Sequence, residues 1–150
     1  MDFNRGDEFA ISTDLDRLDI DVIHAFLARS YWASNIPREI VERSIAHSLC
    51  FGVYHLAAEG VIEQIGFARV ISDYATFAYL ADVFILENFR GKGLSKWLIE
   101  CVRSHPDLQG LRRWVLLTRD AQALYKQYGF RELANPERWF EISRPSGYNM

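Results

Sequence analysis

The fold of this chain is decided by residues 83–102, VFILENFRGKGLSKWLIECV. The start of this stretch completes an apolar, aromatic-rich run over residues 77–86, which is typical of a β-strand. Five apolar residues then recur at the spacing of one helical face: Leu94, Trp97, Leu98, Cys101 and Val102. Two glycines separate the two patterns, so the stretch predicts a strand, a tight loop and a helix.

The loop between the strand and the helix has the chemistry of an anion site. Gly91 and Gly93 can adopt positive φ and let the backbone approach a ligand closely. The first N–H groups of a helix have no intrahelical acceptor, and the helix dipole adds positive potential at the same point. Arg90, Lys92 and Lys96 add whole charges. The loop therefore predicts a phosphate or pyrophosphate site.

Two common phosphate-binding loops do not match this one. The nucleoside-triphosphate loop requires Ser or Thr directly after its Gly-Lys pair, but Gly93 follows Lys92, and Leu86 stands where the loop needs an earlier Gly. The dinucleotide fingerprint requires a third Gly where this chain has Lys96. A nucleotide-binding regulator is therefore disfavoured.

The loop resembles the acetyl-CoA loop of the GNAT family of N-acetyltransferases. That family's pattern is Arg or Gln, two residues, Gly, one residue, and Gly or Ala; here it is Arg90, Gly93 and the small Ser95. Residues 120–130, DAQALYKQYGF, resemble the family's late helix, which carries a Leu-Tyr pair and ends in a Tyr-Gly-Phe turn. The two motifs cover roughly the C-terminal half of the chain.

The resemblance implies an α/β (α+β) GNAT fold with a mixed, mostly antiparallel sheet of six to seven strands, splayed at its centre and flanked by about four helices. A length of 150 residues fits a single domain over residues 1–150. The expected strands are residues 9–13, 49–57, 61–72, 77–86, 112–118, 130–133 and 138–143. The expected helices begin near Asp19, at Pro37, at Gly93 and at Asp120, and the third ends near His105.

The resemblance also implies how acetyl-CoA is held. The backbone amides of Arg90, Gly91, Lys92, Gly93, Leu94 and Ser95 would hold the CoA pyrophosphate. Val83, Phe84 and Ile85 would pair with the pantetheine arm, and an N–H of Val83 or Phe84 would polarise the thioester oxygen. Tyr125 would lie near the CoA sulfur as cofactor contact and general acid, because a phenol with a pKa near 10 is protonated at neutral pH.

The base and the acceptor site are less sharply defined. Asp82 lies where its strand would reach the cleft; it could take the amine's proton, attract the ammonium group or serve as a structural hydrogen-bond acceptor. Glu87, Asp73 and water are alternative bases. The expected substrate-binding residues are aromatic or acidic: Tyr31, Trp32, Asp73, Phe77 and Trp139. The acceptor could be a small-molecule or peptide amine, including an antibiotic, polyamine, amino acid or protein lysine.

Composition excludes several other classes of protein. A net charge of −3 and a pI of 5.8 argue against nucleic-acid binding, and no apolar run approaches the length of a membrane span. The four histidines, His24, His47, His55 and His105, lack zinc-site spacing, so no metal is predicted. Cys50 and Cys101 are expected to be buried free thiols, which suits the cytoplasm. A homodimer is left open.

The sequence thus predicts an acetyl-CoA-dependent N-acetyltransferase that transfers the acetyl group directly to a primary amine within a ternary complex. The alternative is a non-catalytic acyl-CoA-binding sensor or regulatory module. Removal of the Tyr125 hydroxyl distinguishes them, because a sensor has no turnover to lose.

Overall fold

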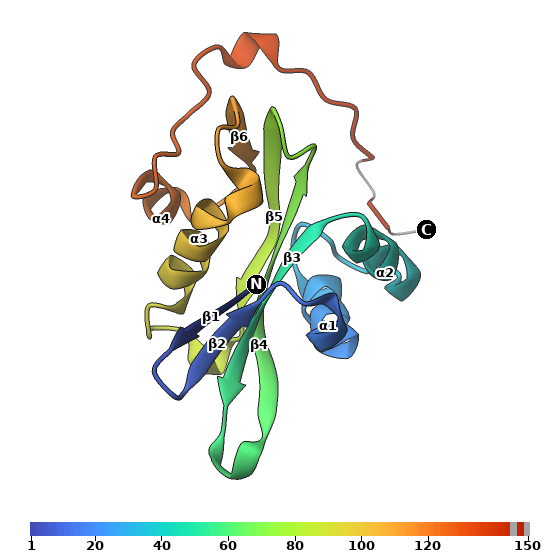
Figure 1. The fold of residues 1–150 in the computed structure, drawn as a ribbon. Helices are drawn as coiled ribbons and strands as arrows, with labels where there is room; N and C mark the ends of the chain where they lie inside the picture. Colours follow the sequence, from blue (N-terminus) through green and yellow to red (C-terminus); the bar gives the residue numbers. More distant parts are fainter. Residues whose placement is uncertain (145–146, 149–150) are drawn as a thin grey trace.

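The computed structural model describes residues 1–144 and 147–148, which form one six-stranded sheet with helices on both faces (Figure 1). The strands lie side by side in chain order, and all neighbours are antiparallel except β5 and β6, which are parallel. The strands are β1 Asp2–Arg5, β2 Phe9–Ser12, β3 Leu49–Leu56, β4 Ile62–Ser72, β5 Phe77–Ile85 and β6 Arg113–Leu116. The α-helices are α1 Ile20–Arg29, α2 Arg38–Ala46, α3 Leu94–Ser104 and α4 Gln122–Lys126.

The helices form two layers with separate cores. α1 and α2 cover one face of the sheet, and α3 and α4 cover the other (Figure 1). One core joins the inner side of α3 to the strands, and the second joins α1 and α2 to Phe67 and Phe84 on the opposite face. β4 and β5 contribute to both cores, as expected for central strands that are buried on both sides.

Local signals explain where the helices begin and end. The Asp19 carboxylate accepts a hydrogen bond from the Val22 N–H at 3.3 Å and caps α1, as predicted. α3 begins after Gly93, whose φ is +76°, and it ends one residue before His105-Pro106. Its predicted apolar face is buried or half-buried against the sheet. No helix among residues 1–144 is long and apolar enough to cross a membrane.

The sheet opens between β5 and β6. The two strands pair from Phe77 with Arg113 to Leu80 with Leu116, and β6 ends there. β5 continues to Ile85, and within the described residues no strand pairs with this edge of residues 82–85. The predicted splay is therefore present, and it leaves a free stretch of β5 edge that leads directly into the glycine loop.

Two sequence predictions about strands are wrong. The sequence placed one strand at the N-terminus, but Asp2–Arg5 forms an additional edge strand that turns at Gly6 into β2. It was missed because its residues are mostly polar. The predicted strands at residues 130–133 and 138–143 do not form; Pro136–Arg138 is a single 3-10 turn, and the other residues of 130–143 pair with no described strand. Apolar alternation gives strand propensity, but a strand also needs a neighbouring edge.

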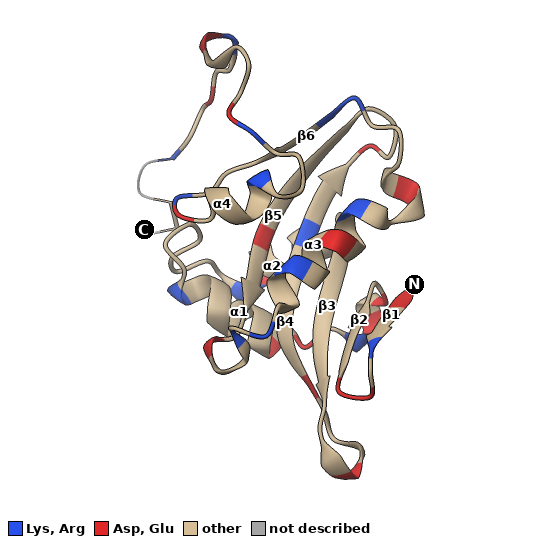
Figure 2. Ribbon diagram, turned by 90° about the vertical axis from the view of Figure 1, so that its left-hand side faces the viewer, with Lys and Arg blue, Asp and Glu red and all other residues tan. Residues whose placement is uncertain are grey.

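Charge is spread over the surface. Lys and Arg alternate with Asp and Glu over the helices and loops (Figure 2). The same view shows the segment after α4 standing away from the body of the protein.

Candidate active site

The glycine loop presents a run of free backbone donors. Gly91 and Gly93 have φ values of +81° and +76°, in the left-handed region that glycine adopts without strain. Within the described part of the chain, none of the N–H groups of residues 91–96 donates a hydrogen bond. The N–H of Arg90 is different, because it donates to the Glu87 carbonyl at 3.2 Å. Consecutive free N–H groups at the start of an eleven-residue helix form an anion site.

Side chains around the loop fix its shape and add positive charge. The Arg90 guanidinium donates back to the Ile85 carbonyl at 3.0 Å, which ties the loop to the end of β5. Arg5 donates to the Gly93 carbonyl at 3.3 Å, and its guanidinium lies 5.9 Å from the centre of the Trp97 ring. Sequence analysis missed Arg5 because it lies on the unpredicted strand β1. Arg5 and Arg90 thus contact the loop directly, and Lys92 in the loop and Lys96 in the first turn of α3 add two further positive charges.

Asp82 lies in a β-bulge in the part of β5 that β6 does not cover. Phe67 pairs with Phe84 and Arg69 with Ala81, so two residues of β5, Asp82 and its neighbour, oppose one residue of β4. Asp82 has a φ of +55°, which is unusual for a residue with a side chain. Such strain persists only where surrounding contacts hold the backbone, and it is frequent at functional sites.

Both carboxylate oxygens of Asp82 have partners. Oδ1 accepts from the Trp32 indole N–H at 2.9 Å, and Oδ2 accepts from the Arg69 Nε–H at 2.8 Å. The side chains of Asp82 and Arg69 are only 11% and 15% exposed. Arg69 also donates to the Ser48 hydroxyl at 3.1 Å. This arrangement favours a structural role for Asp82 over that of a free base.

The loop between α1 and α2 spans the opening in the sheet. Trp32 reaches Asp82 on β5, as described above, and Tyr31 reaches the segment after β6. The Tyr31 hydroxyl accepts from the Arg119 N–H at 3.2 Å, and the Arg119 guanidinium lies 3.8 Å from the centre of the Tyr31 ring. Tyr31 and Trp32 pack edge to face at 5.1 Å. Two half-exposed aromatic rings therefore form one wall at the opening, and their contact with an acceptor stays a prediction.

Tyr125 is the buried phenol of this region. It lies on α4, packs edge to face with Phe130 at 5.8 Å, and its hydroxyl has no hydrogen-bond partner among residues 1–144. Burial, with a smaller contribution from Tyr31, raises the pKa of Tyr125 to about 12. The phenol therefore stays protonated across the physiological range, and its O–H is available to a ligand.

The strand residues predicted to contact the cofactor lie beside the opening. Phe84 and Ile85 are buried, and Val83 is half-buried against the core. The Phe84 ring stacks on Phe26 of α1 at 3.9 Å and with an interplanar angle of 9°. The side chains of Phe84 and Ile85 are therefore packed inside the protein, so these two residues can offer a ligand only their backbone edge.

Three predicted substrate contacts gather at the other end of β5. The carboxylate of Asp73 accepts hydrogen bonds from three backbone N–H groups and from the Thr76 hydroxyl, and the pKa of Asp73 lies far below its usual range, chiefly because of the Thr76 backbone hydrogen bond. One of the three donors is Phe77. Phe77 pairs with Arg113, whose guanidinium lies 5.2 Å from the centre of the Trp139 ring. The structure thus separates these residues from Tyr31 and Trp32.

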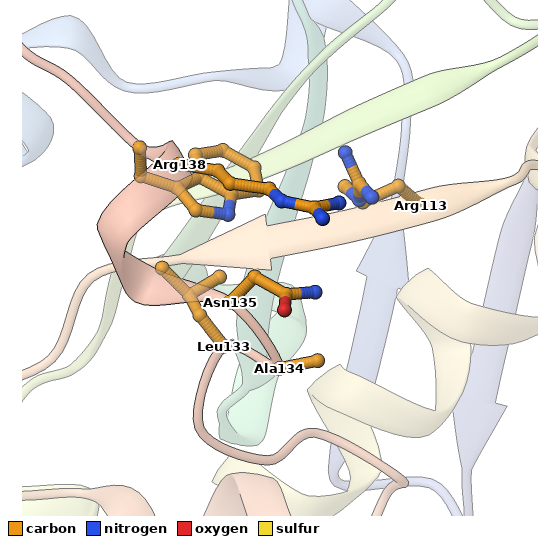
Figure 3. Close-up of a pocket in the computed structure, with 6 residues that line it drawn as sticks. Arg113, Leu133, Ala134, Asn135 and Arg138 are labelled. Atoms are coloured by element: carbon orange, nitrogen blue, oxygen red, sulfur yellow. The ribbon is translucent and has the colours of Figure 1, made fainter.

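Two cavities lie on the β6 side of the molecule. The larger, about 470 Å³, is lined by Arg113, Arg138 and Trp139 together with residues 133–135 (Figure 3). The smaller, about 280 Å³, runs along β6 and includes Tyr125, Phe130 and Leu133 in its lining.

The two other carboxylates that were predicted as alternative bases have little support in the structure. Glu87 lies in the short turn before the loop, and the carboxylate of Asp73 already accepts the hydrogen bonds described above.

The cysteines are not nucleophiles. Cys50 and Cys101 are buried, and burial raises the pKa of each thiol to about 12. Among the described residues no group of three or more His, Cys, Asp or Glu side chains is placed to hold a metal ion.

We expect Asp82→Asn to destabilise the protein by about 2–4 kcal/mol. The amide can still accept from Trp32, but Arg69 would remain largely buried without a counter-ion. Urea unfolding measures the loss. Asp120→Asn is the matched control, because its ion pair with Arg119 is exposed and 3.9 Å long, and it should change stability by less than about 0.5 kcal/mol. If the two substitutions lower the free energy of unfolding equally, the buried pair of Asp82 and Arg69 contributes no more to stability than an exposed ion pair does.

Comparison with known proteins gives consistent results. Residues 50–132 match the model of the acetyltransferase (GNAT) domain. A candidate acetyltransferase from Gibberella zeae is 33% identical to the chain over 88% of this chain and 84% of its own length.

Solved structures agree with this match. A GNAT-family candidate acetyltransferase from Xanthomonas campestris pv. campestris is 50% identical, with a TM-score of 0.88 over 95% of this chain and 97% of that chain. An acetyl-CoA-bound GNAT acetyltransferase from Elizabethkingia anophelis has a TM-score of 0.62 at 15% identity, over 93% and 90% of the two chains. At that identity the likeness concerns the fold alone.

Proposed function

Because this chain belongs to the GNAT acetyltransferase family, we propose that it is a one-domain enzyme that transfers the acetyl group of acetyl-CoA directly to a primary amine. The observation that carries the proposal is the run of free N–H groups at residues 91–96, which continues the free edge of β5 beyond Leu80. A long ligand with a pyrophosphate at one end and an amide-containing arm fits a site with these two parts.

Backbone N–H groups provide most of the contacts that would hold acetyl-CoA in this site. The amides of residues 91–95 would hold the pyrophosphate, with Arg5 and Arg90 fixing the loop beneath them. The backbone of Val83 to Ile85 would pair with the pantetheine arm, and an N–H of Val83 or Phe84 would face the thioester oxygen. Acetyl-CoA supplies the acetyl group as an activated thioester.

Proton transfer is assigned to Tyr125 and water. The protonated phenol of Tyr125 would give its proton to the departing thiolate. Asp82 is engaged by Trp32 and Arg69, so we assign it the positioning of the bulge and of the aromatic wall, and we assign removal of the amine's proton to water in the opening. The acceptor is an amine on a small molecule or peptide that contacts Tyr31 and Trp32. Asp73, Phe77 and Trp139 would contact only an acceptor long enough to reach the far end of β5.

The structure from Elizabethkingia anophelis, which shares the fold, contains acetyl-CoA, and a site of the same architecture in this chain supports the same choice of cosubstrate. We further propose that the enzyme acts in the cytoplasm without a metal ion and as a homodimer. The cytoplasmic location is supported by the two free, buried thiols Cys50 and Cys101, and the proposal that no metal ion is needed is supported by a mechanism that uses only Tyr125 and water.

Calorimetric titration with acetyl-CoA, followed by a thiol-release screen over primary amines, tests the function. We expect micromolar binding and amine-dependent release of CoA. Binding without release for any amine would support the sensor alternative instead. Absence of binding would overturn the proposal altogether.

A further inference from the structure

Two arginines converge on the larger cavity without a counter-ion. Arg113, at the start of β6, and Arg138, in the Pro136–Arg138 turn, extend toward one another across the cavity of about 470 Å³, with the Asn135 side chain beside them (Figure 3). Neither guanidinium makes an ion pair with a carboxylate of the described residues. Facing like charges repel, and an anion between them would replace this repulsion with attraction.

Backbone hydrogen bonds and packing hold both arginines at the cavity. The Arg113 N–H donates to the Thr76 carbonyl at 3.2 Å, and the Arg138 N–H donates to the Asn135 carbonyl at 3.0 Å. The Arg113 guanidinium lies 5.2 Å from the centre of the Trp139 ring, which lines the same cavity. Packing on an aromatic ring orients a guanidinium without using its N–H donors. Two guanidinium forks are thus placed for a group with several acceptor oxygens.

This cavity is separate from the anion site of the glycine loop. β5 runs from Phe77 to Ile85; Phe77 pairs with Arg113, whereas the glycine loop follows Ile85 at the other end of the strand. Eight residue steps of extended strand span roughly 26 Å. A pyrophosphate held at residues 91–96 therefore does not reach Arg113.

One face of the sheet joins the cavity to the opening between β5 and β6. Tyr79 of β5 is opposite Ile71 on β4 and Val115 on β6. Side chains alternate along β4, and Phe67 belongs to the core under α1 and α2, so Ile71 and its partners point to that side of the sheet. The two helices leave this part of the face uncovered, because Ile71 is 44% exposed and the other two side chains are only half-buried.

This uncovered strip runs from the aromatic wall to the two arginines. At one end lies Asp82, whose carboxylate accepts from the Trp32 indole. At the other end the half-buried Phe77 pairs with Arg113. Phe77 is three residues from Leu80, where the opening begins, and five from Asp82, so the ends of the strip lie roughly 10–16 Å apart. A largely apolar path with polar groups at its two ends fits an alkyl or aryl chain.

We propose that Arg113 and Arg138 bind a phosphate group on the acceptor, so that the substrate class is an amine with a phosphate at the far end of its chain. This inference rests on the proposed function, because it takes the reacting amine to lie at the opening. A phosphate monoester carries nearly two negative charges at neutral pH and three acceptor oxygens, which matches two guanidinium forks. An acceptor of this length also contacts Phe77 and Trp139, which a short amine would not reach.

Probe binding in the absence of acetyl-CoA tests the anion site. Aminooctyl phosphate has the required length, and aminooctanol is the same chain without the phosphate. We expect calorimetry to show at least about tenfold tighter binding of the phosphate. The double variant Arg113→Gln, Arg138→Gln should reduce this preference to within about twofold. The matched control Arg43→Gln, Arg112→Gln, which removes two exposed charges outside the cavity lining, should keep it.

Gly93→Trp separates this site from the glycine loop. Its indole would cover the free amides, so a phosphate probe bound at Arg113 and Arg138 should keep its advantage over the alcohol in this variant. Equal affinity for the two probes, a preference that survives Arg113→Gln, Arg138→Gln, or a preference that disappears in Gly93→Trp would each overturn the proposal.

Steady-state rates with acetyl-CoA connect the anion site with the acceptor. The value of kcat/KM should be at least about tenfold higher for aminooctyl phosphate than for aminooctanol. Aminoethyl phosphate is too short to span the strip, so Arg113→Gln, Arg138→Gln should not change its rate. Equal rates with the two long amines would overturn the proposal and leave the acetyltransferase function standing. Phosphate binding without acetylation of any amine would overturn the acceptor assignment together with the proposed function, while the anion site itself would stand.

Discussion

Tyr125→Phe should lower kcat by about 100-fold or more while leaving acetyl-CoA affinity nearly unchanged. The substitution removes one buried hydroxyl that has no protein partner among the described residues, and it keeps the ring that packs on Phe130. Only the proton offered to the thiolate is lost. Steady-state rates with saturating amine, together with calorimetry for acetyl-CoA, measure the two effects separately.

Tyr128→Phe is the matched control for this experiment. Tyr128 carries its hydroxyl at the surface just beyond α4, where it donates to Glu100 at 3.1 Å, and its loss should leave kcat within about twofold. The wild-type pH profile gives a second check. An acid works while protonated, and a pKa raised to about 12 extends that range upward, so kcat should not fall between pH 8 and pH 10 through Tyr125. A falling limb near pH 10 that Tyr125→Phe abolishes would contradict the burial described here.

Gly93→Trp should abolish acetyl-CoA binding. Gly93 is exposed and has a φ of +76°, and a Cβ there would lie 3.5 Å from the Arg5 guanidinium, directly beside the free amides. A large side chain at this point both strains the backbone and covers the anion site. Calorimetric titration should change from micromolar binding to no detectable heat.

The strain of positive φ needs its own control. Gly110→Trp provides it, because Gly110 is also exposed, has a φ of +74°, and has no atom within 4 Å of a Cβ added there. Both variants should lose similar stability, of the order of 1 kcal/mol. Only Gly93→Trp should lose the ligand. Unchanged binding by Gly93→Trp would remove the glycine loop from the cofactor site.

The elements that sequence predicted best are those with local determinants. The loop and α3 follow from two glycines, an apolar face and His105-Pro106, all within about twenty residues. The parallel pairing of β5 and β6 follows from the helix that connects them. The resemblance of the two motifs to the GNAT family predicted the splay of the sheet and the location of Tyr125. Neither follows from the periodicity of apolar residues alone.

The predictions that failed or remained open depend on distant contacts. The C-terminal strands were predicted from apolar alternation, but no strand in the described part of the chain pairs with these residues. Arg5 could not be placed at the loop, because it comes from 88 residues earlier in the chain. Asp82 was correctly located on its strand, and the sequence left its role open between base, attractor of the ammonium group and structural acceptor. Its two partners, Trp32 and Arg69, come from other elements and favour the structural role.

Because both cysteines are deeply buried, the folded chain should contribute almost no signal to an assay that detects free thiols. A chromogenic disulfide reagent reacts with thiolates, and Cys50 and Cys101 offer almost none, because they are 1% and 4% exposed with pKa values of about 12. In a continuous assay the folded enzyme should therefore add no signal to that of the CoA thiol released. Slow colour development in the absence of amine would then report unfolding, so the same cuvette can follow turnover and the integrity of the protein.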